Sequence, residues 1–149
     1  MNESFILEND RVLLQPLTLD NFEELISIAS QENLVQYSPS NISTRISLKD
    51  YVETAIYQLK NGTSIPFIIY DKQKKAYAGS TRFMNINFKN KVLHIGSTWI
   101  GREFHGSGLN DRMKSLMLEH AFIKMDFEKV EFRVDERNIK KRCISARWV

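Results

Sequence analysis

The sequence predicts one domain of mixed α/β architecture, in which an antiparallel meander leads into a parallel strand–helix–strand unit. The chain has 149 residues, of which 42% are hydrophobic and 26% charged, as is typical of a single globular domain with a full core. Apolar residues recur at helical spacing up to residue 60 and then in short β-prone runs. Gly106 and Gly108 stand where the last of these runs passes into a new helical pattern.

The amino-terminal part predicts a strand followed by two helices. The first apolar run stops near Pro16, and Thr18 and Asp20 are suitable caps for the helix that follows. The second helix ends at Asn61-Gly62, a typical carboxy-terminal stop signal. We therefore expect a strand over 11–17, a helix over 20–31, a loop over 37–45 and a helix from 47 to 60.

The remaining part predicts three strands, a helix and a further strand. Short polar turns separate the first three runs, which favours antiparallel pairing. The run that follows the helix should pair in parallel with the run before it. The expected elements are strands over 65–70, 76–85 and 92–100, a helix over 109–125 and a strand over 129–134. Gly96 indicates either a bulge in its strand or a close-packed strand glycine.

Composition and charge exclude several classes of protein. No apolar run approaches the roughly 20 residues of a membrane span, and the amino terminus lacks the features of a signal peptide. The single cysteine, Cys143, cannot form an internal disulfide, so we expect a reducing, cytoplasmic location. Residues 138–149 form a basic tail without acids, whereas residues 1–137 carry 17 basic and 18 acidic side chains. A nearly neutral body argues against nucleic-acid binding.

The glycine turn has two interpretations. Gly106 and Gly108 either shape a tight turn or let a phosphate approach the free N–H groups of a helix amino terminus. A nucleoside-triphosphate loop would need Lys and Ser or Thr after the glycine, and the chain has Leu109-Asn110. A dinucleotide-binding turn would need a third glycine where Asp111 stands.

A wider segment, "TWIGREFHGSGLNDRMKSLMLEHAF" followed by "MDFEKVEFRVDERNIK", resembles the GNAT acetyltransferases, and the RimJ/RimL-type subgroup in particular. The opening "RVLLQPLTLDNFEEL" is similar to the first strand and helix of that subgroup, so that the resemblance covers about two thirds of the chain. It implies a GNAT-like fold and transfer of acetyl from acetyl-CoA to a primary amine, of a protein amino terminus or a small molecule, by direct attack. No metal is implied.

The resemblance also assigns a cofactor site. It implies that Gly106 to Asn110 bind the pyrophosphate of coenzyme A, with pantetheine between two splayed parallel strands. Backbone N–H groups near Trp99 and Ile100 would polarise the thioester carbonyl. The residues that the resemblance places at the cofactor are Trp99, Ile100, His105, Gly106, Ser107, Gly108, Leu109, Asn110 and Asn138.

No catalytic base is assigned. His94 stands where many relatives carry a glutamate, and it is either a proton acceptor or a hydrogen-bonded structural histidine of the sheet. His120 lies within the helical pattern and is expected to be structural.

The tail departs from the family pattern. Lys141 occupies a position where relatives have serine, and the family's last helix and final strands have no counterpart before Val149. We therefore expect a truncated or frame-shifted form, with an uncovered sheet edge that favours a homo-oligomer. The alternative function is a non-catalytic domain that binds CoA or associates with itself.

Overall fold

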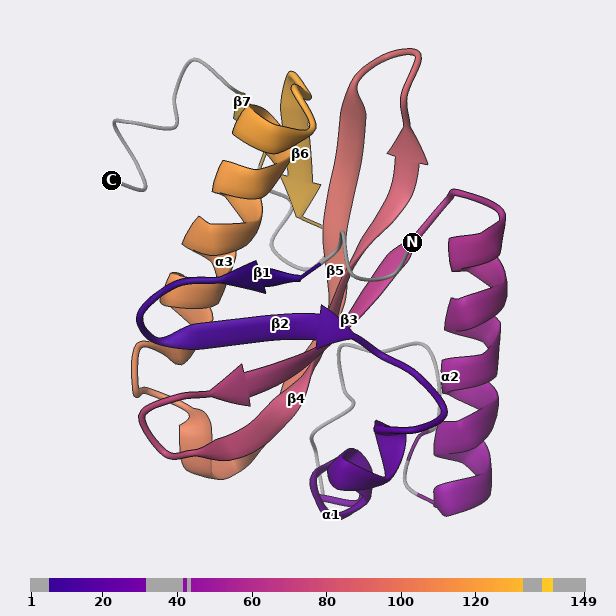
Figure 1. The fold of residues 1–149 in the computed structure, drawn as a ribbon, viewed down its shortest axis with the longest axis vertical. Coiled ribbons are helices and arrows are strands. Elements are labelled where there is room, and N and C mark those ends of the chain that lie inside the picture. Colours follow the sequence, from indigo (N-terminus) through magenta and orange to yellow (C-terminus); the bar gives the residue numbers. More distant parts are fainter. Residues whose placement is uncertain (1–5, 32–41, 43, 133–137, 141–149) are drawn as a thin grey trace.

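The computed structural model describes residues 6–31, 42, 44–132 and 138–140, and its centre is a seven-stranded sheet in the order β1 to β7 (Figure 1). Every neighbouring pair is antiparallel except β5 and β6, which are parallel. This confirms both the predicted meander and the parallel unit. The strands are β1 Leu7–Glu8, β2 Val12–Pro16, β3 Ile65–Asp71, β4 Ala76–Asn87, β5 Val92–Ile100, β6 Lys129–Phe132 and β7 Asn138–Lys140.

The helices lie where the sequence predicts them, with differences at their ends. The 20–31 segment forms a 3₁₀ turn, Phe22–Leu25, and one turn of α1, Ile26–Ala29. The second helix, α2, spans Arg45–Lys60. It begins two residues earlier than predicted because Thr44, the N-cap residue, forms a reciprocal capping box with Ser47 in the first turn. The third, α3, spans Leu109–Glu119 and ends in a π-helical turn, His120–Lys124.

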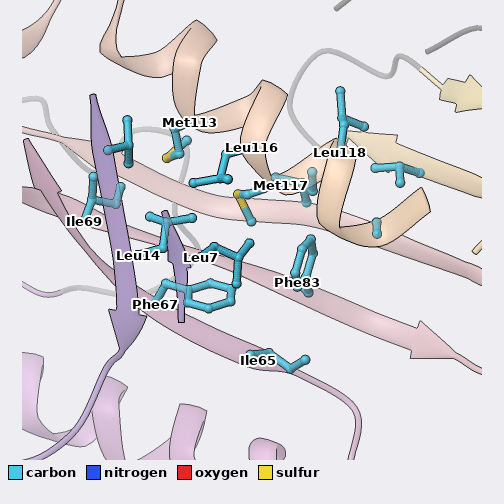
Figure 2. Packing of buried hydrophobic residues seen from close by; sticks show 14 of the residues in the cluster. Leu7, Leu14, Ile65, Phe67, Ile69, Phe83, Met113, Leu116, Met117 and Leu118 are labelled. Atoms are coloured by element: carbon cyan, nitrogen blue, oxygen red, sulfur yellow. The ribbon is translucent and has the colours of Figure 1, made fainter. Parts of the chain in front are cut away.

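The helices cover opposite faces of the sheet, α3 one face and α1 with α2 the other (Figure 1). Alternation along the strands serves both faces, since Phe67 and Ile69 pack towards α3 while Ile68 packs towards α1 and α2. Figure 2 shows Met113 and Met117 of α3 above the strand residues. The two apolar clusters therefore hold the sheet between layers.

A bulge in β5 changes which face its side chains reach. Ser80 pairs with Trp99 and Arg82 with Gly96, so β5 has one more residue than β4 between these pairs. In a regular strand Trp99, four residues after Ile95, would lie on the same face, but Ile95 packs in the α3 cluster and Trp99 in the α1 and α2 cluster. Of the two interpretations of Gly96, the register of the strands shows the bulge.

The ends of the chain differ most from the prediction. Strands β1 and β7 were not predicted, and β7 begins at Asn138, the first residue of the predicted basic tail. The first three residues of the predicted basic tail therefore form a strand, which pairs antiparallel with β6. The tail from 141 to 149, the last part of the predicted strand 129–134 and most of the predicted loop 37–45 lie outside the described residues. The expectation of a missing carboxy-terminal helix and final strands falls there as well.

Candidate functional site

The glycine turn connects the end of β5 to the start of α3. After the short 3₁₀ turn Arg102–Phe104, Gly106 and Gly108 adopt left-handed φ angles of +73° and +87°. A Cβ added at Gly106 would meet no atom within 4 Å, and one at Gly108 would meet only an Arg11 nitrogen at 4.0 Å. Both positions therefore favour glycine for their backbone angles, and the space above them is open.

In the first turn of α3, the N–H groups of Asn110 and Asp111 have no hydrogen-bond partner among the described residues, and that of Leu109 has only a weak one. Gly108 is the N-cap residue, and no side chain caps the helix. Ser107 gives only a long contact, 3.4 Å, to the N–H of Leu109, and its hydroxyl donates to the Phe104 carbonyl at 2.6 Å. Asn110 follows in the exposed first turn. The amino terminus of an eleven-residue helix with free N–H groups is suited to an anion.

A buried ion pair between Arg11, near the amino terminus, and Asp71 supports the glycine turn. Arg11 donates to the Ser107 carbonyl and hydroxyl, both at 3.2 Å, and its Nε donates to Asp71 at 3.0 Å. The Asp71 side chain is fully buried and that of Arg11 is 12% exposed. Burial alone would raise the pKa of Asp71, but hydrogen bonds from Arg11 and from the Gln73 N–H outweigh it and lower the pKa below 3.8.

Sequence reasoning missed this support. Arg11 stands at the start of the predicted strand, and its partners are 60 and 96 residues away along the chain. A charged residue at the start of an otherwise apolar strand, "RVLLQPL", was the only local signal.

The end of β5 presents a backbone donor. The Gly101 N–H donates to the Ala78 carbonyl at 2.8 Å, and the next registered pair is Gly79 with Ile100. Because bonded and non-bonded pairs alternate along an antiparallel ladder, the Ile100 N–H points away from β4. The ring of His105 lies here too, with Nε2 donating to the Ile100 carbonyl at 2.9 Å. Contact between His105 and a phosphate stays a prediction.

The parallel pairing of β5 and β6 runs from Val92 with Lys129 to Ile95 with Phe132, the last described residue of β6. Ile100 lies five residues further along β5. The backbone of Asn138, the first residue of β7, is paired with that of Glu131 in β6. The predicted splay of the two strands concerns residues after this registered stretch.

The two histidines of the sheet and helix have structural partners. His94 Nε2 lies 2.5 Å from Glu131 across the β5–β6 pair, and its Nδ1 lies 3.5 Å from the Asn85 amide. The ring of His120 stacks on Phe83 with centroids 6.0 Å apart. Burial, aided by the nearby charge of Lys124, lowers the pKa of His120 below 6.5.

The described residues contain neither a metal-binding group nor a membrane-spanning helix. No group of three or more His, Cys, Asp or Glu side chains there is placed to hold a metal ion. In the same part of the chain, no helix has the length and apolar character that crossing a membrane requires.

Comparison with known proteins gives one family and a common fold. The acetyltransferase (GNAT) domain model matches residues 11–148, a stretch that includes most of the basic tail. No curated protein is significantly similar in sequence.

Three solved structures illustrate the common fold. A putative ribosomal-protein-serine acetyltransferase from Vibrio cholerae has a TM-score of 0.78 at 16% identity, covering 99% of this chain and 83% of its own. A GCN5-related N-acetyltransferase from Brucella melitensis has a TM-score of 0.74 at 22% identity, over 84% of this chain and 57% of its own. RimL, a ribosomal L7/L12 alpha-N-protein acetyltransferase in complex with coenzyme A, has a TM-score of 0.75 at 19% identity, over 87% and 76%. The chain thus spans little more than half of the Brucella protein.

Proposed function

Since the chain belongs to the acetyltransferase (GNAT) domain family, we propose that it transfers an acetyl group from acetyl-CoA to a primary amine by direct attack. The acceptor is the amino group of a protein amino terminus or of a small molecule. The observation that carries the proposal is the glycine turn, whose left-handed glycines leave open space in front of the first turn of α3.

The residues of the turn fit a pyrophosphate. Gly106 and Gly108 allow close approach, and the first turn of α3 provides the N–H groups of Asn110 and of Leu109, the latter held only by a long contact to Ser107. Arg11 fixes the turn through Ser107, while Asp71 balances its charge. The coenzyme A in the RimL structure supports the choice of ligand.

The end of β5 suits the transfer step. The coenzyme supplies a thioester whose carbonyl carbon accepts the amine. The Ile100 N–H, directed away from β4, would stabilise the negative charge that develops on the carbonyl oxygen. The amine attacks in its neutral form, and the thiol leaves with a proton. Both ring nitrogens of His94 lie close to other side chains, so we assign no base.

Calorimetric titration of the purified chain with acetyl-CoA, and separately with desulfo-CoA, tests the cofactor site. We expect both to bind, because recognition depends on the pyrophosphate and the pantetheine arm. A panel of amines then follows, with release of free CoA thiol as the readout. A folded protein that binds neither cofactor would contradict the proposal, and binding without turnover of any amine would favour a non-catalytic CoA-binding domain.

A further inference from the structure

The α2 face of the sheet holds buried polar groups that have no hydrogen-bond partner. Arg82 of β4 is 6% exposed, and its Nε is unpaired. The hydroxyl of Tyr51, on α2, and the indole Nε1 of Trp99, on β5, are also buried and unpaired. Native proteins satisfy nearly all such groups, because a buried unpaired donor forfeits its bonds to water.

These groups lie together. The Arg82 guanidinium carbon is 4.8 Å from the centroid of the Tyr51 ring, and the Tyr51 and Trp99 rings meet edge to face at 6.3 Å. Arg82 pairs with Gly96 across the ladder, where the bulge in β5 begins, and the bulge turns Trp99 to this face. We call Arg82, Tyr51 and Trp99 the donor cluster.

Within the described part of the chain, the positive charge of the donor cluster is uncompensated, because no carboxylate there forms an ion pair with Arg82. Within the described residues, its guanidinium makes one hydrogen bond, from Nη1 to the neutral amide oxygen of Gln58 at 3.1 Å. The face of Tyr51 offsets part of the charge. Isolating a guanidinium from water is costly unless an anion meets it.

The cluster also lies beside the proposed transfer site. Trp99 precedes Ile100, whose N–H we assign to the thioester carbonyl, and Arg82 faces the other end of the same bulge. Because the two places are this close, one acceptor molecule would reach both, with its amine at the transfer site and a second group at the cluster. A carboxylate suits it best, because its oxygens accept from guanidinium, phenol and indole donors and its small size suits a site this covered.

We propose that Arg82, Tyr51 and Trp99 bind the carboxylate of an acceptor that carries its reactive amine and a carboxylate in the same molecule, such as a free amino acid. This inference rests on the proposed acetyl transfer for its context. It predicts a preference for amino acids over amines that lack an acidic group.

A binding test needs no turnover. N-acetylglycine and N-acetylglycinamide differ only in the carboxylate, and neither has a reactive amine. We expect N-acetylglycine to raise the Tm of the wild-type chain, whereas N-acetylglycinamide leaves it unchanged. Arg82→Gln should abolish the effect, and Tyr51→Phe should weaken binding about threefold to tenfold through loss of one hydroxyl. Arg45→Gln is the matched control, because Arg45 lies on the same helix as Tyr51 but forms an exposed ion pair, with Glu23.

A stability test examines the uncompensated charge directly. In the absence of ligand, Arg82→Met should leave the Tm unchanged or raise it, because an apolar side chain replaces an isolated buried charge. A large fall in Tm would show that the protein itself already neutralises Arg82, and it would overturn the inference.

A kinetic test connects the cluster to the reaction. With acetyl-CoA, we expect kcat/KM at least tenfold higher for glycine than for glycinamide, and likewise for alanine over alaninamide. The amides lose their ammonium protons more readily, so this preference cannot come from a larger fraction of neutral amine. Arg82→Gln should remove the preference, and Arg45→Gln should keep it.

The outcomes separate the two proposals. Acetylation of amines with no carboxylate preference, and no effect of N-acetylglycine on Tm, would overturn the cluster and leave acetyl transfer intact. An effect of N-acetylglycine that Arg82→Gln abolishes, in a chain that acetylates no amine, would uphold the carboxylate site and refute acetyl transfer.

Discussion

Gly79 of β4 touches the backbone of β5 so closely that no side chain fits there. A Cβ at this position would lie 1.9 Å from the Trp99 carbonyl oxygen, 2.9 Å from its carbon and 3.0 Å from the Ile100 Cα. All three are backbone atoms, so relief requires movement of the strand itself. Gly79→Ala would need the Trp99 oxygen to move by about 1 Å to reach the closest approach that real Cβ atoms show.

The size of the effect follows from this displacement. Forcing a methyl group into a packed interior costs about 1 to 3 kcal/mol, and we expect the upper value because strand backbone must yield. At about 2 to 4 °C per kcal/mol for a chain of this size, the Tm should fall by about 6 to 12 °C. The same shift displaces the Ile100 N–H, and about 1 Å of misplacement at a reacting group costs on the order of a hundredfold in rate.

Urea unfolding followed by circular dichroism measures the loss of stability, and release of CoA thiol measures the loss of rate. Gly62→Ala is the matched control, because Gly62 has a φ of +77° and no atom within 4 Å of an added Cβ. It should lose only about 1 to 2 kcal/mol for the left-handed backbone and keep its activity. Equal stability of the two variants, or full activity in Gly79→Ala, would refute the reasoning.

Two further predictions concern pH. Asp71→Asn should cost about 3 kcal/mol at pH 7, because it leaves Arg11 without its buried partner. Because the folded-state pKa of Asp71 lies below 3.8, its ionised carboxylate stabilises the fold above about pH 4, and this stabilisation is lost on further acidification. Urea titrations from pH 7 to pH 3 should show this loss of unfolding free energy in the wild type but not in Asp71→Asn. The pKa of His120 lies below 6.5, so the unfolded chain takes up this proton first and stability falls as pH drops below 6.5. His120→Phe keeps a ring against Phe83 and should flatten the unfolding free energy between pH 7.5 and 5.5, and an unchanged slope would count against this assignment.

Local patterns sufficed for much of the architecture. Hydrophobic period and turn residues located β3, β4 and β5 to within a few residues, and Gly106 with Gly108 located the helix amino terminus. Gly96 indicated the bulge because a glycine weakens a regular strand. These features depend on neighbouring residues alone, which is why one sequence shows them.

Tertiary contacts were not visible in the same way. The support of the glycine turn joins Arg11 to Ser107 across 96 residues, and no local spacing marks it. Arg82 lies in the strand pattern "GSTRFMNIN", where alternation predicts a polar residue facing water, yet α2 covers that face and buries it. Its burial depends on where Tyr51 and Gln58 of α2 pack against the sheet.

The proposed function depends on binding of the coenzyme A pyrophosphate by the turn from Gly106 to Asn110. Calorimetric titration of CoA into the wild type, Gly106→Ala and Gly62→Ala tests it most directly. Both variants place alanine at a left-handed position with no atom within 4 Å, so their losses of stability should match. We predict a Kd at least tenfold higher for Gly106→Ala, because its methyl group occupies the space of the anion, and within about twofold of wild type for Gly62→Ala. Wild-type affinity in Gly106→Ala would contradict the claim.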